Sequence, residues 1–262
     1  MKLTLSLAQF NIINGDPAAN LATVQTMAAE AARRGSDILL LPELWAMGGD
    51  LERGAAYVAD ERHAVQEAVA ALARQHQLHI IGSDLGLNGA GKMTNTAVFY
   101  NNNGRSIASY DKIHLFQLMG EHHHLSGGDH LSLVETDWGK MGLAICYDLR
   151  FPELFRAYAL AGAQLVFLPA EWPHPRLAHW RTLLRARAIE NQMFVVACNR
   201  AGRDDQYHFF GHSTIVDPWG EIVVEAGEGE MLLTAAIELD RVTAVRQHIP
   251  IFADRRPEVY GQ

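Results

Sequence analysis

Cysteine is scarce in this chain of 262 residues, and no long apolar run occurs in it. The two cysteines, Cys146 and Cys198, are too few for a disulfide framework or a cysteine-rich zinc site. No apolar run approaches the roughly 20 residues that a membrane helix needs, so we expect no membrane association. The first residues carry only Lys2 as a cation and alternate apolar with polar positions, which argues against a secretory signal. We therefore expect a cytoplasmic protein.

Positive charge is also in deficit, with 22 lysines and arginines against 30 aspartates and glutamates, for a net charge of −8. Because binding to nucleic acid or to an anionic membrane needs clustered cations, we expect neither as a partner. The composition, 48% hydrophobic and 20% charged, is that of a globular protein and excludes a disordered or fibrous chain. No repeat or linker interrupts the sequence, which predicts a single domain over residues 1–262.

Helical and strand-like periodicities alternate along the chain. Strands are predicted at residues 3–7, 37–42, 79–82, 95–100, 106–110, 141–145, 164–168, 194–197, 211–216, 221–224 and 231–237. Helices are predicted at residues 18–34, 61–75, 152–161, 176–192 and 240–247, followed by an extended, Pro-containing tail. Asp16 and Pro17 suit the N-cap and first-turn positions of the first helix. Several strands are apolar throughout and some are joined by hairpins, which predicts an α/β fold with mixed sheets buried between helices.

Residues 111–130 have little periodicity. A connection this long without secondary structure is usually functional. It contains three consecutive histidines, His122, His123 and His124. Consecutive side chains on a strand or helix diverge, whereas zinc needs converging ligands. We therefore expect a solvated loop, a lid or a subunit contact here, and no metal site.

Three reactive side chains each follow the end of a predicted strand: Glu43, Lys112 and Cys146. In buried α/β sheets, functional sites collect at strand ends. A carboxylate, an amine and a thiol that converge there supply a nucleophile, its base and a cation. Each residue alone has a simpler interpretation: a rim carboxylate, a solvated lysine or a buried structural cysteine. Cys198 follows an apolar strand with no helix start behind it, and we expect it to be a core residue.

The surroundings of Cys146 favour a reactive thiol. It follows a predicted strand and precedes a helix that begins near Pro152. A strand–nucleophile–helix turn exposes the side chain and points backbone N–H groups at its reaction partner. A helix N-terminus and a nearby ammonium group would both favour the thiolate, so we expect a thiolate at this position.

Three segments of the chain resemble, in the same order, the signature regions of the nitrilase superfamily of carbon–nitrogen hydrolases. They are LLLPELW (39–45), YDKIHLF (110–116) and GLAICYDLRFPELFR (142–156), and residues 185–192, 211–213 and 217–220 agree as well. The resemblance covers about residues 3–240. It implies a four-layer α-β-β-α sandwich and homo-oligomers, dimers or larger, that associate through helical faces. It also implies that Glu43, Lys112 and Cys146 are the catalytic Glu–Lys–Cys triad of the family, with Glu121 as its second glutamate.

Residues 169–200 resemble bacterial ω-amidases most, which implies 2-oxo acid amides such as 2-oxoglutaramate as substrates. On this hypothesis the thiol of Cys146 attacks the amide carbon and forms a thioester. Glu43 acts as general base and then acid, and Lys112 and the backbone N–H of Tyr147 hold the oxyanion. Glu121 would orient Lys112 or the substrate, and no cofactor is required.

A substrate with a free carboxylate needs a cation in its binding pocket, and arginine matches a carboxylate bidentately. Arg150, close to the nucleophile, is the first candidate, with an ion pair to Glu153 as the equal alternative. Arg176 is a weaker candidate. Further candidates for the pocket wall are the large side chains of Trp172, Phe116 and Met119. Core packing is the alternative for Trp172.

Three other functions remain open at this point. The first is hydrolysis of another small carbon–nitrogen substrate, such as deaminated glutathione, a nitrile or a carbamoyl amino acid. The second is a noncatalytic binding module of this fold, which an intact set of Glu43, Lys112 and Cys146 argues against. A metallohydrolase built on the histidine run is the least favoured of the three.

Overall fold

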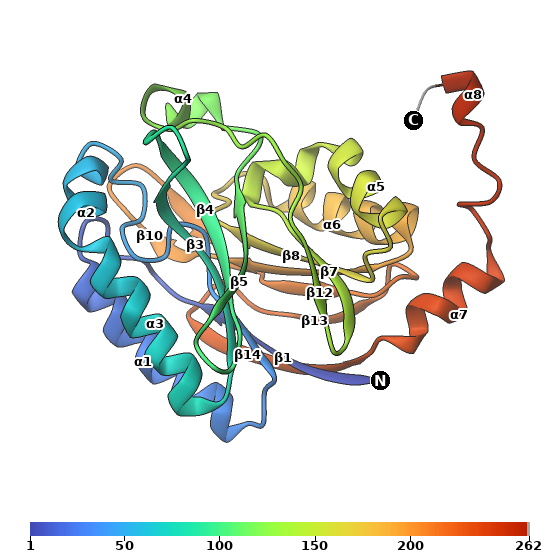
Figure 1. Ribbon diagram of the computed structural model, residues 1–262, viewed down its shortest axis with the longest axis horizontal. Coiled ribbons are helices and arrows are strands. Elements are labelled where there is room, and N and C mark those ends of the chain that lie inside the picture. The colour runs from blue at the N-terminus through green and yellow to red at the C-terminus, as the bar shows by residue number, and fades with distance from the viewer. Residues whose placement is uncertain (261–262) are drawn as a thin grey trace.

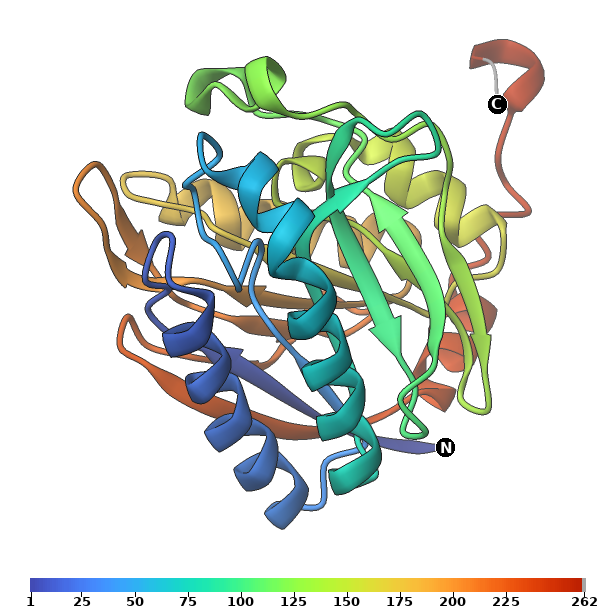
Figure 2. The ribbon, with the colours of Figure 1, turned by 60° about the vertical axis from the view of Figure 1, so that its left-hand side comes forward.

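The computed structural model describes residues 1–260, which fold into four layers. Two six-stranded sheets pack face to face, and helices cover the outer face of each (Figure 1). The helices are α1 (Pro17–Arg33) and α3 (Arg62–His76) on one side, and α5 (Pro152–Leu160) and α6 (Leu177–Asn191) on the other. Figure 2 shows α1 and α3 lying side by side over the first sheet. The predicted α/β fold, a four-layer α-β-β-α sandwich with mixed sheets, is confirmed.

The first sheet joins the two ends of the chain. Its strands are β1 (Lys2–Gln9), β2 (Ile38–Leu40), β3 (His79–Leu87), β4 (Met93–Tyr100), β5 (Ser106–Asp111) and β14 (Met231–Glu238). The strand order is β14-β1-β2-β3-β4-β5. β1, β2 and β3 run parallel to one another. The pairs β14 and β1, β3 and β4, and β4 and β5 are antiparallel. β1 is therefore an inner strand, paired along its whole length with β14.

The second sheet places three parallel strands at its centre. Its strands are β6 (Leu133–Thr136), β7 (Gly139–Leu143), β8 (Leu165–Ala170), β9 (Phe194–Asn199), β12 (Thr214–Val216) and β13 (Ile222–Glu225). The order is β13-β12-β9-β8-β7-β6, and β7, β8 and β9 are parallel. The carboxyl ends of these three strands therefore meet at one edge of the sheet, where ligand sites form in α/β proteins.

The largest apolar core lies between the two sheets. Leu3, Leu5 and Leu7 alternate along β1 and are fully or almost fully buried in this core. Phe99 of β4 meets Phe167 of β8 across the interface, with ring centroids 6.1 Å apart and nearly perpendicular planes. Such edge-to-face contact suits two sheets packed at about 10 Å. The alternating and continuous apolar patterns in the sequence thus place one face of each strand in this core.

Helix α1 begins and packs as its sequence predicts. The side chain of Asp16 accepts a hydrogen bond from the Ala19 N–H (3.0 Å), and Pro17 occupies the first turn. Val24, Ala28 and Ala31 are fully buried at positions i, i+4 and i+7. This spacing places all three on one face of the helix, against the first sheet.

Several short elements were not predicted from the sequence. They include α2 (Gly54–Asp60), the strand β6, β10 (Ala201–Arg203), β11 (His208–Phe210), and two helical turns in the segment that was predicted to be a loop, η1 (Gln117–Met119) and α4 (Glu121–His124). Each is too short to show a periodic pattern. The strand predicted from residue 211 starts only at Thr214, because Gly211 and His212 have φ values of +67° and +52° and leave the extended region.

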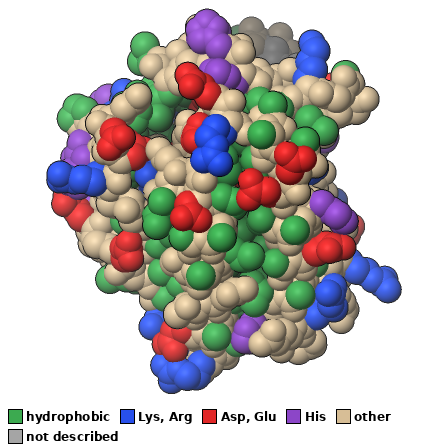
Figure 3. All heavy atoms as spheres, turned by 90° about the vertical axis from the view of Figure 1, so that its left-hand side faces the viewer, with side chains coloured by type: hydrophobic (Ala, Val, Ile, Leu, Met, Phe, Trp, Pro, Cys, Tyr) green, Lys and Arg blue, Asp and Glu red, His purple; other side chains and the backbone are tan. Residues whose placement is uncertain are grey.

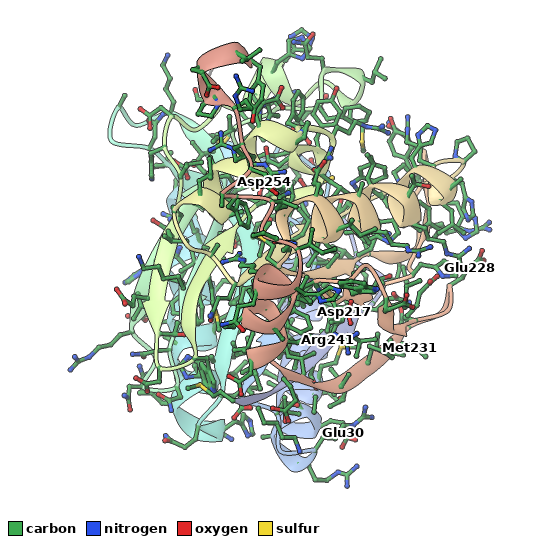
Figure 4. All side chains as sticks on the ribbon, turned by 90° about the vertical axis from the view of Figure 1, so that its right-hand side faces the viewer. Glu30, Asp217, Glu228, Met231, Arg241 and Asp254 are labelled. Carbon is green, nitrogen blue, oxygen red and sulfur yellow. The ribbon has the colours of Figure 1, made fainter. Side chains whose placement is uncertain are left out.

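The helix that follows β14, α7 (Asp240–His248), is held against the second sheet. Arg241 Nε lies 2.7 Å from Asp217 Oδ2, in the turn between β12 and β13, and Figure 4 shows the two side chains facing each other.

The tail was predicted to be extended, which is wrong for its last described residues. Pro257 begins the short helix α8 (Pro257–Tyr260), since proline suits the first helical position. Figure 1 shows α8 standing away from the four layers.

Charged side chains are dispersed over the face that carries α1, α2 and α3. Figure 3 shows acidic and basic groups interspersed there with many small apolar ones, and no cluster of lysines and arginines on this face. Within residues 1–260, no helix combines the length and the apolar character needed to cross a bilayer.

Candidate active site

Cys146 stands at a sharp turn between strand and helix. β7 ends at Leu143, and Cys146 opens the 3₁₀ turn η2 (Cys146–Arg150), just before α5. Its φ is +48°, which is uncommon for a residue with a side chain and persists only where the surroundings enforce it. The residue is 7% exposed and lies at the wall of a cavity. The structure therefore places this thiol on a strained turn between strand and helix, as the sequence context predicted, but the residue is largely buried, whereas an exposed side chain was expected.

Asp148 fixes this turn. Its fully buried carboxylate accepts hydrogen bonds from the Ile145 N–H (2.9 Å) and the Tyr110 hydroxyl (2.7 Å). The carboxylate also lies 2.8 Å from His114 Nδ1 and accepts the His114 N–H at 3.1 Å. Tyr110 and His114 flank Lys112 along the chain, so one carboxylate ties the segment of the nucleophile to the segment of the lysine. Sequence reasoning missed Asp148 and Tyr110.

Glu43 and Lys112 both follow strands, and hydrogen bonds hold the backbone beside each of them. After Glu43, the Leu44 N–H donates to Ser83 Oγ (3.0 Å), and Leu44 has a φ of +44°. After β5, the Gly128 N–H donates to the Lys112 carbonyl (2.9 Å). A Cβ at Gly128 would lie 2.2 Å from the Asp111 carbonyl oxygen. Only glycine lets the returning loop pass this close to the strand.

Lys112 lies between two carboxylates. Its Nζ donates to Glu43 Oε1 (2.8 Å) and to Glu121 Oε1 (2.7 Å), and its side chain is fully buried. Glu43 Oε1 also accepts from Asn95 Nδ2 (2.8 Å), and Glu43 Oε2 accepts the N–H of Glu171 (3.0 Å). Both oxygens of Glu43 are therefore oriented by hydrogen bonds. Asn95 and Glu171 were not identified from the sequence.

Glu121 reaches this group because the segment after β5 folds back on itself. Gly120 has a φ of +74°, and Glu121 begins α4. Its second oxygen, Oε2, accepts the Phe116 N–H at 2.8 Å. The structure thus brings together Glu43, Lys112, Glu121 and Cys146, the four residues predicted to be catalytic.

The electrostatics of this group favour a neutral thiol. Burial opposes the charge of Lys112, but Glu43 and Glu121 together hold its pKa well above the ordinary value. Burial raises the pKa of Glu121, against the effect of Lys112. Burial also raises the pKa of Cys146 well above its ordinary value; Glu43 adds to the rise and Lys112 opposes it. The expectation of a thiolate is therefore wrong: one ammonium faces two carboxylates, so a third negative charge is unfavourable.

All six residues predicted to bind substrate line one cavity together with Cys146, Glu43 and Glu121. They are Tyr147, Arg150, Trp172, Phe116, Met119 and Arg176. Further lining residues that the sequence did not single out are Leu44, Gly49, Leu51, Glu171 and Pro173. Lys112 is absent from this lining and is fully buried, but its Nζ is bonded to Glu43 and Glu121, which both line the cavity. Apolar and aromatic side chains with a few polar groups form the wall of the cavity, as in most small-molecule sites.

The two arginines of the cavity stack on aromatic rings. The guanidinium carbon of Arg150 lies 4.7 Å from the centre of the Trp172 ring, and that of Arg176 lies 5.4 Å from the centre of Phe116. The nearest polar contact of Arg150 is His179 Nδ1, at 3.4 Å. Within the described chain no carboxylate forms an ion pair with either arginine, so the alternative pairing of Arg150 with Glu153 does not occur. Both cations are left available to an anionic ligand.

Two histidine clusters lie outside this cavity. His122, His123 and His124 are exposed on α4. His174, His208 and Glu228 are also exposed, and their ligand atoms lie within 4.8 Å of one another. Among the described residues, these three are the group whose ligand atoms lie close enough together to share a metal ion, and Figure 4 shows Glu228 on a loop at the edge of the molecule. Neither cluster lines the cavity of Cys146.

The chain resembles known proteins over nearly its full length. The carbon–nitrogen hydrolase family model matches residues 4–247. The chain is 40% identical to the 2-oxoglutaramate amidase of Bacillus subtilis (strain 168), over 99% of this chain and 100% of that protein. It is 34% identical to an omega-amidase of Mus musculus, over 99% of this chain and 96% of that protein.

Solved structures agree with these sequence comparisons. An amidase from Nesterenkonia sp. matches with a TM-score of 0.88 and 28% identity, over 98% of this chain and 95% of that chain. One structure of a variant of that amidase contains the product of Michael addition of acrylamide at its active-site cysteine. Saccharomyces cerevisiae Nit3, a member of the nitrilase superfamily, matches with a TM-score of 0.88 and 31% identity, over 95% of each chain.

The fold and these matches define the class of protein, a hydrolase of carbon–nitrogen bonds built as an α-β-β-α sandwich. The chain belongs to the carbon–nitrogen hydrolase family, within the nitrilase superfamily. The resemblance stated from the three signature segments is thereby confirmed.

Proposed function

We propose that the protein is a cofactor-free cysteine amidase that hydrolyses the side-chain amide of a small 2-oxo dicarboxylic acid monoamide, such as 2-oxoglutaramate or 2-oxosuccinamate. Its products would be the dicarboxylic acid and ammonia. The observation that carries the proposal is the position of Cys146 and Glu43 at a cavity, with Lys112 bonded to Glu43 behind its wall and with two arginines in the wall that have no carboxylate partner among residues 1–260. The relatives named 2-oxoglutaramate amidase and omega-amidase support the choice of substrate.

The first half of the reaction forms a thioester. Because the thiol of Cys146 rests neutral, its proton moves to the carboxylate of Glu43 as Sγ attacks the amide carbon. The carbonyl oxygen becomes an oxyanion, which Lys112 Nζ and the N–H of Tyr147 stabilise. Tyr147 lies in the first turn of η2, where an N–H has no acceptor within the helix. Glu43 then gives the proton to the amide nitrogen, and the C–N bond breaks to release ammonia.

The second half hydrolyses the thioester. A water molecule enters, and Glu43 takes one of its protons as the oxygen attacks the thioester carbon. The C–S bond breaks, the carboxylic acid leaves, and Glu43 returns the proton to the sulfur. Glu121 holds Lys112 in place throughout, through the 2.7 Å contact that it makes in the resting site. Arg150 and Arg176 are the candidates to bind the free carboxylate of the substrate.

Replacement of each cysteine in turn tests the nucleophile. Cys146→Ala should abolish ammonia release from 2-oxoglutaramate, because it removes the attacking atom. Cys198→Ala is the matched control: this thiol is fully buried in the core, away from the cavity, and donates to the Ala8 carbonyl (3.3 Å), so turnover should persist. Turnover by Cys146→Ala at the wild-type rate would refute the mechanism. So would an acyl group trapped on the peptide of Cys198 when turnover is quenched.

A substrate panel tests the specificity. Ammonia release should be fastest from 2-oxoglutaramate or 2-oxosuccinamate, and slower from glutamine, a nitrile, a carbamoyl amino acid and deaminated glutathione. A higher kcat/KM for any of the last four would replace the proposed substrate. If no panel member is hydrolysed and iodoacetamide does not alkylate Cys146, the protein is a binding module of this fold.

We also propose that the protein acts in the cytoplasm as a single-domain homo-oligomer, a dimer or larger. Two exposed apolar side chains on the outer helices support self-association: Leu160 of α5 is 45% exposed and Ile189 of α6 is 49% exposed. Light scattering measures the oligomer size, and an exclusively monomeric protein would refute the self-association.

A further inference from the structure

Glu171 is a buried carboxyl group on the cavity wall that the mechanism above does not use. It follows β8 directly, as the segment of Cys146 follows β7, and the two parallel strands are neighbours in the sheet. The residue is 5% exposed and lines the cavity of Cys146. Its N–H orients Glu43, but its side chain takes no part in the group around Lys112.

The carboxyl group of Glu171 lies in a cluster with excess negative charge. Arg200 Nη1 lies 3.3 Å from Glu171 Oε1 and 3.4 Å from Asp204 Oδ2, so one fully buried guanidinium faces two carboxyl groups. Burial raises the pKa of Glu171 to about 8; Arg200 opposes the rise, and Glu43 and Asp204 add to it. At neutral pH the group is therefore mostly protonated, and a protonated carboxyl can donate one hydrogen bond.

One oxygen of this carboxyl group is left for a ligand. Within the described part of the chain, the side chain of Glu171 makes one hydrogen bond, in which its Oε1 accepts from Arg200. Oε2 thus has no protein partner there, while the residue borders the cavity. The other polar groups of the wall outside the catalytic group include the guanidinium groups of Arg150 and Arg176, which can only donate.

We propose that Glu171 forms the subsite for the substituent on carbon 2 of the substrate, and that its carboxyl O–H donates a hydrogen bond to the 2-oxo oxygen. This inference rests on the proposed function. Carbon 2 is bonded to the carboxylate carbon, so a group that contacts the oxo oxygen lies beside the guanidinium that binds the carboxylate. Trp172, the next residue along the chain, stacks under Arg150. Ionised Glu171 cannot donate and would instead pair with a 2-ammonium group, so this residue sorts oxo acid amides from amino acid amides.

Three amides of equal length test the subsite: 2-oxoglutaramate, L-glutamine, and glutaramate, which has no substituent on carbon 2. We would measure kcat/KM for each with the wild type, Glu171→Gln and Glu171→Ala between pH 6.5 and 9. We would compare kcat/KM for 2-oxoglutaramate with kcat/KM for glutaramate as a ratio. Titration of the catalytic group changes both values alike, so it cancels in this ratio. Glu171→Gln keeps a donor and cannot ionise, so it is the matched control for the pH dependence.

In the wild type, the ratio of kcat/KM for 2-oxoglutaramate to kcat/KM for glutaramate should fall about fivefold from pH 6.5 to 9. The protonated fraction of a group with a pKa near 8 falls over this range, and the ionised form lacks the hydrogen bond. The ratio of glutamine to 2-oxoglutaramate should rise over the same range. In Glu171→Gln the first ratio should stay constant with pH, and in Glu171→Ala it should be about tenfold lower at pH 7, the typical effect of one lost hydrogen bond.

Two results would overturn the subsite while leaving the amidase intact. One is a wild-type ratio that does not change with pH, and the other is Glu171→Ala with the wild-type ratio and normal hydrolysis of glutaramate. A wild-type protein that releases ammonia from none of the three amides would instead refute the proposed function, and the subsite with it. If Glu171→Ala does not fold, the comparison of the wild type with Glu171→Gln still decides the question.

Discussion

The position of Lys112 between two buried carboxylates makes the stability of one variant depend strongly on pH. Lys112→Met keeps an unbranched side chain but removes the cation that lies 2.8 Å from Glu43 and 2.7 Å from Glu121. The two carboxylates are 3% and 10% exposed, so neither can be solvated well in place of the ammonium. In the variant, two negative charges would share a buried site, and one of them must take up a proton.

The magnitude follows from the cost of an unpaired buried charge. Removal of one partner of a buried ion pair typically costs about 3–5 kcal/mol, which we expect at pH 8. The carboxyl group that takes up this proton, on Glu43 or Glu121, has a higher pKa in the folded variant than a glutamate has in the unfolded chain. Stability from such a group is present at low pH and is lost as the pH rises, at about 1.4 kcal/mol per pH unit. Between pH 8 and pH 5.5 the variant should therefore regain about 3 kcal/mol relative to the wild type.

Urea unfolding followed by circular dichroism at pH 8 and pH 5.5 measures these differences. Lys140→Met is the control, because Lys140 is an exposed lysine on β7 and its loss should change the free energy of unfolding by less than about 0.5 kcal/mol. A deficit of Lys112→Met that is equal at the two pH values would refute the charge argument. A deficit below about 1 kcal/mol at pH 8 would show that the cost of an unpaired buried charge does not apply here.

Two further predictions concern the cavity and the turn of the nucleophile. Arg150→Met should raise KM for amides with a free carboxylate far more than for neutral amides, because the guanidinium has no carboxylate partner among the described residues; equal changes in KM for both kinds of amide would point to a structural role. Asp148→Ala should lower the free energy of unfolding by about 2–6 kcal/mol, at about 1–3 kcal/mol for each buried donor left unsatisfied, since it leaves the Ile145 N–H and the Tyr110 hydroxyl without their acceptor. Tyr110→Phe, which removes one of these bonds, should cost only about 1 kcal/mol, and equal losses in the two variants in chemical denaturation would contradict the assigned role of Asp148.

The residues at strand ends could be predicted because their positions depend on local sequence. An apolar run marks each strand, and the residues within the next three positions lie at the edge of the sheet, as found for Glu43, Lys112 and Cys146. Glu171 carries the same signal, since it follows the fully buried strand β8, and it was overlooked. Glu121 could be placed only by resemblance, because its position depends on how an aperiodic segment folds back through Gly120.

Contacts between distant segments could not be predicted from the sequence. The bond from the Glu171 N–H to Glu43 spans 128 residues of chain, and Asn95 reaches Glu43 over 52. Periodicity identifies the face of a strand but not which strands are neighbours. The expectation of a thiolate failed for the same reason: it included the ammonium of Lys112, but neither the burial of Cys146, which raises its pKa most, nor the neighbouring carboxylates could be derived from the sequence.

The pairing of the first strand with the last has a consequence for biosynthesis. β1 leaves the ribosome first, yet its antiparallel neighbour β14 begins only at Met231. At a translation rate of 5–20 residues per second, the nascent chain holds one edge of β1 uncovered for roughly 10–50 seconds. An open strand edge invites pairing with other chains, so nascent polypeptides that stall before β14 are the species of this protein most prone to aggregate.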